Sequence, residues 1–356
     1  MKLLSVIIPA YNMEAYLAQC VESILRTPSL AAVEIIIVND GSKDKTLRIA
    51  KQYAERYVDT VRVVDKPNGN YGSTINAALP LAQGEYVKIL DADDRFDGSR
   101  VAEMLAFLHK MQGVDMVVTP FVEVAGRREH RVEYNIYSRK VYEYGKAYDA
   151  DKIFSDGVIR YFMMHGVCYR TEMLRKMSYR QSEGVSYTDQ EWVFYPLFKV
   201  KTIAFANIPL YRYNLSREGQ TMDSKVQMRS LSQLVAVTEA MTRYFISASR
   251  FVHSSKRLNF LRNIVADRVR IVYRKYLLVM NNKSFAASDF AMVDVRLMRL
   301  VAQARIEEFS VPVNNLLKVD LLKSWQKRGR RLTSFVRKSL YHLDKFMIAV
   351  HGAIFR

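Results

Sequence analysis

The chain has 356 residues, of which 49% are apolar and 25% are charged; this composition is close to the globular average and excludes global disorder. Its two cysteines, Cys20 and Cys168, are too few for a disulfide scaffold or a cysteine-based metal site. The formal net charge of +18 is uneven, because residues 1–216 hold 28 basic and 26 acidic side chains whereas residues 217–356 hold 26 and 10. The charge pattern therefore predicts a near-neutral N-terminal unit followed by a strongly basic C-terminal unit.

Apolar runs alternate with stretches of helical spacing along the N-terminal unit. We expect strands at residues 5–9, 33–38, 61–64, 86–90 and 115–118, and helices at residues 12–24, 44–57, 75–82 and 99–111. Solid apolar strands with helices between them predict a parallel sheet that is covered on both faces. Ligands of such sheets bind beyond the carboxyl ends of the strands, so the loops after residues 9, 38, 64 and 90 should surround one site.

A carboxylate cluster follows the expected strand 86–90. Asp91, Asp93 and Asp94 place three carboxylates within four residues, and such groups repel one another unless a cation neutralises them. Mg²⁺ is typically held by one or two carboxylates together with substrate phosphates. The cluster therefore predicts a site for a divalent metal, Mn²⁺ or Mg²⁺, with a solvated acidic turn as the alternative.

Several common nucleotide and hydrolase motifs are missing from the sequence. Residues 69–72 (GNYG) do not form GxGxxG, and no GK[ST] follows an expected strand, which argues against a Rossmann dehydrogenase and a P-loop NTPase. No HExxH or GxSxG motif supports a metalloprotease or an α/β-hydrolase. The opening run MKLLSVIIPAY contains Pro9 and no uncharged apolar run reaches roughly 18 residues, so we expect neither export nor a membrane span.

Several segments, in this order along the chain, resemble the family-2 glycosyltransferases with the GT-A fold. They are SVIIPAYN (5–12), IIIVNDGSKDKT (35–46), LDADD (90–94) and SYTDQEW (186–192), and a bacterial surface-polysaccharide subgroup is resembled by NGNYGSTINAAL (68–79) and YRYNLSREGQTM (211–222). Asn39 stands where many relatives have a first aspartate, and Ile75 where many have arginine. The resemblance covers roughly residues 1–222 and implies an α/β fold there: a GT-A type, Rossmann-like, mostly parallel sheet with helices on both faces.

The resemblance implies a nucleoside site after the first three strands. Asp40 would accept the imide N–H of uracil or thymine, which cytosine does not offer; its alternative role is a turn before Gly41. Pro9 and Tyr11 would wall the base, although Tyr11 could equally pack at a strand end. Asn68 would add a polar contact to the nucleoside, or simply form a turn.

The same resemblance assigns the sugar and diphosphate contacts. Asp91 would face the ribose and the sugar, and Asp93 would ligate the metal that bridges the diphosphate. Arg217 and Gln220 would lie in a loop that closes over the diphosphate, an anion that arginine suits. A surface salt bridge is the alternative for Arg217.

Asp189 is the candidate general base, because an inverting sugar transfer needs a carboxylate that takes the proton of the acceptor hydroxyl. Asp189 also precedes an apolar run, so a helix N-cap is its alternative role. Glu191 is the second candidate, as base or as a group that orients the acceptor. His165 and Trp192 are expected acceptor contacts; a lone histidine in an apolar stretch is otherwise a core residue.

The C-terminal region, residues 223–356, is expected to be mainly α-helical and basic, with helices near 225–252, 256–281, 285–305 and 332–356. Residues 323–356 hold nine basic side chains and one acidic, and an apolar stripe runs along their last helix. A basic amphipathic helix of this kind can lie in a membrane interface, or the stripe can pack on other helices or on a second subunit of a homo-oligomer. We expect peripheral binding to an anionic membrane surface, and a cytoplasmic location on the inner face of the cell membrane.

The sequence thus predicts a metal-dependent, inverting glycosyltransferase with a nucleoside-diphosphate sugar as donor. A uridine-linked (UDP) sugar is the expected donor. A lipid-linked or polymeric bacterial glycan, such as a capsule or cell-wall precursor, is the expected acceptor, with a protein-linked glycan as the alternative. The pI near 9.7 also suggests a nucleic-acid-binding protein, but no recognition motif for nucleic acid accompanies the charge. A nucleotidyltransferase is a third alternative, against which the missing phosphate loop argues.

Overall fold

The computed structural model describes residues 2–135, 138, 140–216, 231–279, 287–307, 309–311 and 322. The chain forms two units, Met1–Gln220 with Phe251–Leu261, and Thr221–Arg250 with Arg262–Arg356. The functional division expected at residues 222/223 stays a prediction.

An eight-stranded sheet forms the centre of the first unit. Its strands stand in the order β3 (Val61–Lys66), β2 (Val33–Asp40), β1 (Leu4–Ala10), β4 (Tyr86–Ile89), β10 (Val167–Arg170), β6 (Met116–Val118), β11 (Thr202–Phe205) and β9 (Ala147–Asp149). The first four strands are mutually parallel, β11 is parallel to β6, and β10 and β9 are antiparallel to their neighbours. The expected α/β fold is confirmed, with these antiparallel pairings as an addition that the sequence pattern did not predict.

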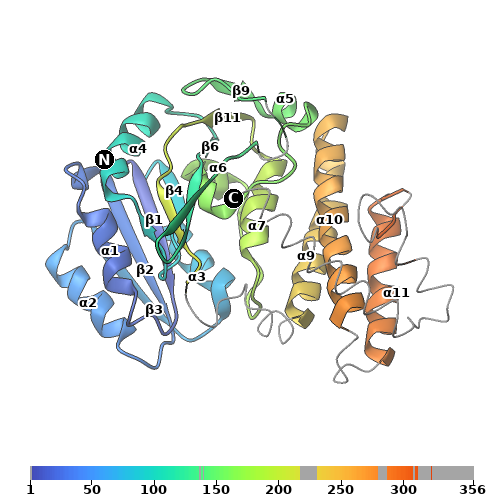
Figure 1. Ribbon diagram of the computed structural model, residues 1–356, viewed down its shortest axis with the longest axis horizontal. Helices are drawn as coiled ribbons and strands as arrows, with labels where there is room; N and C mark the ends of the chain where they lie inside the picture. The colour runs from blue at the N-terminus through green and yellow to red at the C-terminus, as the bar shows by residue number, and fades with distance from the viewer. Residues whose placement is uncertain are drawn as a thin grey trace. The chain divides into compact units, whose positions relative to one another are not determined.

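Helices cover both faces of the parallel part of the sheet (Figure 1). They are α1 (Leu17–Leu25) and α2 (Thr46–Arg56) on one face and α3 (Asn70–Ala78) on the other, and further along the chain follow α4 (Gly98–Lys110), α5 (Ala150–Ser155), α6 (Thr171–Lys176) and α7 (Asp189–Phe194). Every residue of β1 and of β2 is consequently buried. Each fully buried Val, Ile or Leu side chain there stabilises the fold by roughly 1.5–3 kcal/mol.

A second, four-stranded sheet lies in the same unit and was not predicted. Its order is β5 (Arg95–Phe96), β12 (Tyr211–Asn214), β7 (Phe121–Ala125) and β8 (Arg128–Val132). β5 begins directly after the carboxylate cluster and pairs with β12, with Phe96 opposite Tyr211. This pairing brings residues from about 120 positions further along the chain next to the cluster.

The expected helix at 75–82 is corrected by the structure. α3 begins at Asn70, and residues Leu79–Leu81 form a 3₁₀ turn. The glycines at 69 and 72 disfavour a helix by intrinsic propensity, but Gly72 is required by packing: a Cβ at this position would lie 2.1 Å from the Ser182 carbonyl oxygen. Tertiary contact therefore overrides local propensity at the start of α3.

The second unit is helical, as expected. It contains α9 (Leu231–Ala248), the later part of α10 (Ser255–Val279) and α11 (Ala287–Gln303). Tyr273 donates a hydrogen bond of 2.7 Å to Asp294, and Arg296 pairs with Glu239 at 2.9 Å. None of the helices within the described residues is long and apolar enough to cross a membrane. The expected helix at 332–356 lies outside the described residues.

Candidate active site

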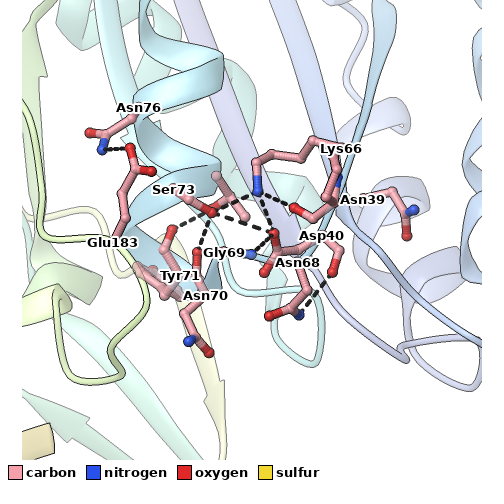
Figure 2. A network of polar contacts seen from close by, with 12 residues as sticks. Asn39, Asp40, Lys66, Asn68, Gly69, Asn70, Tyr71, Ser73, Asn76 and Glu183 are labelled. Atoms are coloured by element: carbon pink, nitrogen blue, oxygen red, sulfur yellow. Dashed lines mark hydrogen bonds and ion pairs between the residues drawn. The ribbon is translucent and has the colours of Figure 1, made fainter.

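Asp40 is the last residue of β2 and lies opposite Lys66, the last residue of β3. Its carboxylate is 3% exposed, and its Oδ1 accepts hydrogen bonds from Lys66 Nζ at 2.7 Å and from the Gly69 amide at 2.9 Å (Figure 2). Asn68 Nδ2 donates to the Asp40 carbonyl oxygen at 2.9 Å. No hydrogen bond from another described residue engages Asp40 Oδ2, so the two oxygens of this carboxylate have different surroundings.

The other expected nucleoside contacts surround the same strand ends. Pro9 is buried in β1 opposite Val38, whereas Tyr11, just beyond the strand, is 45% exposed. Asn39 Nδ2 donates to Asp65 Oδ1 at 2.7 Å. The amide at position 39 thus suits its neighbour, because an aspartate there would face a second carboxylate.

The three carboxylates of the cluster after β4 have distinct environments. Asp91 Oδ1 accepts a hydrogen bond of 2.8 Å from Tyr71 Oη in α3. Asp94 is 4% exposed and accepts from Tyr211 Oη at 2.5 Å and from the Asn214 amide at 2.7 Å. Burial, together with the charges of Asp91 and Asp93, raises the pKa of Asp94 to about 8. Asp94 therefore stabilises the loop through its hydrogen bonds to Tyr211 and Asn214. Asp93 is half-buried.

The cluster was tested for its fit to a divalent metal. The described residues contain no group of three or more His, Cys, Asp or Glu side chains that could hold an ion by themselves. Both oxygens of Asp94 accept from protein donors, whereas Tyr71 engages one oxygen of Asp91, so Asp93 and Asp91 are the better candidates for holding a metal. One or two carboxylates completed by phosphate oxygens is the usual Mg²⁺ arrangement, so the donor set fits a metal that arrives with a nucleotide.

Asp189 is the first residue of the short helix α7, and the N-cap position belongs to Thr188. Its carboxylate is half-buried, and Gln190 Nε2 donates to its Oδ2 at 2.6 Å. Burial raises the pKa of Tyr71 well above its ordinary value, and the charges of Asp91 and Asp189 raise it further. Asp91 thus contacts the Tyr71 hydroxyl directly, and Asp189 acts on the same hydroxyl through its charge.

Two residues of the same helix face inward, which corrects their expected roles. Glu191 is 0% exposed and accepts from the Ser182 amide at 2.6 Å, Ser182 Oγ at 2.7 Å and Tyr195 Oη at 2.9 Å. Trp192 is also 0% exposed and packs edge-on against Tyr169 and Tyr179. A buried carboxylate with three donors is not placed to take a proton from an acceptor, and the buried indole is not placed to touch one.

His165 lies in an aromatic cage beside the small sheet. Its ring stacks on Tyr213 with centroids 4.3 Å apart, and the rings of Phe121 and Tyr211 lie at 4.9 and 4.8 Å. Burial, with the nearby charge of Lys88, lowers the pKa of His165 to about 3, so the ring is neutral at pH 7. In this structure the histidine is chiefly a packing residue, and the acceptor contact expected of it stays a prediction.

Several residues at the site carried little or no signal in the sequence. Lys88 is fully buried in β4 and donates to the carbonyl oxygens of His165 and Val167 at 2.7 and 3.1 Å; burial lowers its pKa to about 8. The sequence signal for this buried lysine was its position inside the apolar run YVKIL, residues 86–90. Lys66 had none, because its contact with Asp40 depends on the β2–β3 register. Arg217 and Gln220 lie outside the described residues.

Residues 5–177 match the family model described as Glycosyl transferase family 2. A stretch of 146 residues is 35% identical to the minor teichoic acid biosynthesis protein GgaB of Bacillus subtilis, covering 40% of this chain and 16% of that protein. The matched segments span 39% and 40% of two further bacterial relatives, so the chain covers well under two thirds of these proteins.

Two solved structures share the fold. TarS of S. aureus, residues 1–349 in complex with UDP-GlcNAc, has a TM-score of 0.54 and 18% identity over 94% of this chain and 93% of that chain. The mannosyltransferase PcManGT of Pyrobaculum calidifontis, in complex with GDP-Man and Mn²⁺, has a TM-score of 0.50 and 14% identity over 85% and 86% of the two chains. The likeness extends over most of the chain and agrees with the expected GT-A type fold.

Proposed function

Residues 5–177 are a glycosyltransferase family 2 domain, and from this we propose that the chain transfers a sugar from a uridine-diphosphate donor to a hydroxyl group of a bacterial surface glycan. The observation that carries the proposal is that Asp40 and Asp91 are both held at the start of α3, by Gly69 and Ser73 and by Tyr71, and that the charge of Asp189 also acts on the Tyr71 hydroxyl. The names of the two further relatives, each an uncharacterized glycosyltransferase, support the reaction class. The teichoic acid biosynthesis name of GgaB supports a surface glycan, and the UDP-GlcNAc bound to TarS supports a uridine donor.

The proposed reaction inverts the sugar in one displacement. Asp189 accepts the proton of the acceptor hydroxyl as its oxygen forms a bond to the anomeric carbon. The bond from that carbon to the diphosphate oxygen breaks on the opposite face, and the nucleoside diphosphate leaves. Asp93, with Asp91 beside it, would hold Mn²⁺ or Mg²⁺, which when bound stabilises the negative charge that develops on the departing diphosphate. Tyr71 fixes the orientation of Asp91.

The donor class is tested by a panel of nucleotide sugars. Purified protein is incubated with UDP-Glc, UDP-Gal, UDP-GlcNAc, dTDP-sugars and GDP-Man, with and without Mn²⁺, and release of the nucleotide is measured. Turnover of a UDP-sugar that depends on Mn²⁺ supports the proposal. If no donor is turned over and the protein binds nucleic acid tightly, the alternative of a nucleic-acid-binding protein, which the net charge of +18 suggests, would be favoured instead.

Asp40 allows a sharper test of the nucleoside. Its Oδ1 faces three donors, Lys66 Nζ, the Gly69 amide and Ser73 Oγ. In an Asp40→Asn variant the amide oxygen should therefore take this place and the NH₂ group the place of Oδ2. The NH₂ group then opposes the N3–H of uracil but can donate to N3 of cytosine. Because a hydrogen bond to a charged group contributes roughly 1.5–3 kcal/mol, we expect UDP affinity to fall about 10- to 100-fold and CDP to bind better than UDP.

Isothermal titration with UDP and CDP measures both affinities. Asp65→Asn is the matched control, since this exposed carboxylate lies near the end of the neighbouring strand and contacts Asn39; it should keep the wild-type preference. An Asp40→Asn variant that still prefers UDP would contradict the assignment of the base to Asp40.

Membrane attachment is a separate part of the proposal. Residues 323–356, which lie outside the described residues, carry nine basic side chains and one acidic, and each basic group near an anionic surface contributes ~1 kcal/mol that falls with salt. Co-sedimentation with phosphatidylserine vesicles should be strong for the full chain at low salt and lost for a chain that ends at Leu322. Equal binding by both would place the contact elsewhere.

A further inference from the structure

A short segment, residues 181–184, is held directly against α3. Asn76 in α3 pairs with the backbone of Gln181 on both sides: its Oδ1 accepts from the Gln181 amide at 2.8 Å, and its Nδ2 donates to the Gln181 carbonyl oxygen at 2.9 Å. The same Nδ2 also donates to Glu183 Oε1 at 2.8 Å (Figure 2). The Gly184 amide donates to the Gly69 carbonyl oxygen at 2.8 Å. An asparagine side chain thus fixes this segment to α3 much as a neighbouring strand would.

The other side of the segment is fixed to α7. Glu191 accepts both the amide and the hydroxyl hydrogen of Ser182, at 2.6 and 2.7 Å, and Tyr195 Oη holds the same carboxylate at 2.9 Å. Burial raises the pKa of Glu191, which its three donors oppose. Residues 181–184 therefore connect α3 with the helix that begins at Asp189.

The N-cap side chain does not stabilise the beginning of α7. The helix is six residues long, and its N-cap residue Thr188 makes no capping hydrogen bond through its side chain; its buried Oγ1 has no partner among the described residues. Tyr187, just before it, has a positive φ of 69°, a conformation that non-glycine residues adopt only when their surroundings impose it. Without a side-chain cap, contacts of the neighbouring residues, among them those of Glu191 with Ser182, help to set the position of Asp189.

We propose that Asn76 and Glu191 are positioning residues that set the place of Asp189 relative to the donor. α3 contacts Asp40 through Gly69 and Asp91 through Tyr71, so the segment ties the base to the helix that touches the donor carboxylates. The inference rests on the proposed function, in which Asp189 is the base. It explains why Glu191 is buried two residues after Asp189, and why position 72 carries no side chain where Ser182 approaches.

The test compares Asn76→Ala and Glu191→Gln with wild type, with Ser182→Ala as a milder variant that keeps the backbone bond to Glu191. A displacement of about 1 Å in a reacting group can cost ~10²-fold in rate, so we expect kcat for transfer to fall ~10- to 100-fold in the first two variants and less in the third. UDP affinity should stay within about twofold. Hydrogen exchange of the amides of residues 181, 182 and 184 should accelerate. Arg180→Ala, which removes only an exposed ion pair with Glu183, should leave rate and exchange unchanged.

A double-mutant cycle separates positioning from a general structural effect. If Asn76 acts through Asp189, adding Asn76→Ala to Asp189→Asn should change the residual rate by less than about twofold. Full activity in Asn76→Ala, or additive losses in the double variant, would overturn the inference. If wild type transfers from no donor, the proposed function fails instead, and unchanged exchange at residues 181–184 in Asn76→Ala would then independently show that Asn76 does not hold the segment.

Discussion

Replacing Asp189 with asparagine is expected to reduce sugar transfer by ~10²–10⁴-fold, the range for loss of a general base, while UDP affinity stays within about twofold. The asparagine side chain has the same size and can still accept from Gln190 Nε2, so the helix should be retained. It cannot take a proton from the acceptor hydroxyl. Initial rates with a saturating UDP-sugar, together with titration of UDP, separate the two effects.

The comparison with Glu191→Gln distinguishes a base from a positioning residue. Asp189→Asn leaves the contacts of Ser182 with Glu191 intact, so amide exchange at residues 181–184 should remain slow although transfer is lost. Glu191→Gln should lose both. An active Asp189→Asn variant would contradict the assignment, and a lower melting temperature with normal turnover would point to a purely structural role at the start of α7.

Removing the carboxylate of Asp93 is expected to abolish metal-dependent turnover. In Asp93→Ala, UDP affinity measured in Mn²⁺ should equal that of wild type in EDTA, because the metal that Asp93 would hold is lost in both cases. Charge stabilisation by a metal contributes several kcal/mol at the transition state, so turnover should fall by at least ~10²-fold. Wild type in EDTA should show the same loss.

The control is Asp65→Asn, which changes a carboxylate near the site that lies outside the cluster after β4. It should keep both turnover and the response to Mn²⁺. Unchanged activity of wild type in EDTA would overturn the metal proposal, and unchanged Mn²⁺ dependence in Asp93→Ala would move the ligand to another carboxylate.

The parallel strands and the carboxylates after β4 were predictable because each is encoded locally. β1 and β2 are solid apolar runs, and burial on both faces is what such runs require. The small sheet was missed because β5 has two residues and exists only by pairing with β12. Periodicity in a six-residue helix could not reveal that Glu191 points inward, since its burial depends on donors at Ser182 and Tyr195. The predicted start of α3 was wrong because glycine has a low helix propensity, whereas Gly72 is required by the close approach of the Ser182 carbonyl oxygen.

The unequal surroundings of the two Asp40 oxygens also bear on how this protein can evolve. Oδ1 forms an ion pair with Lys66, a side chain only 21% exposed, and Oδ2 is the atom proposed to select the nucleobase. A mutation that alters base choice at this position therefore also leaves a half-buried ammonium without its counter-charge, at a cost of about 1–3 kcal/mol of stability. If Asp40 selects the base as proposed, a change in the preferred nucleotide through this position requires either a less stable intermediate variant or simultaneous changes at positions 40 and 66. Under the proposed assignment, one carboxylate serves both the fold and the ligand, and this double role would protect the donor preference against single mutations.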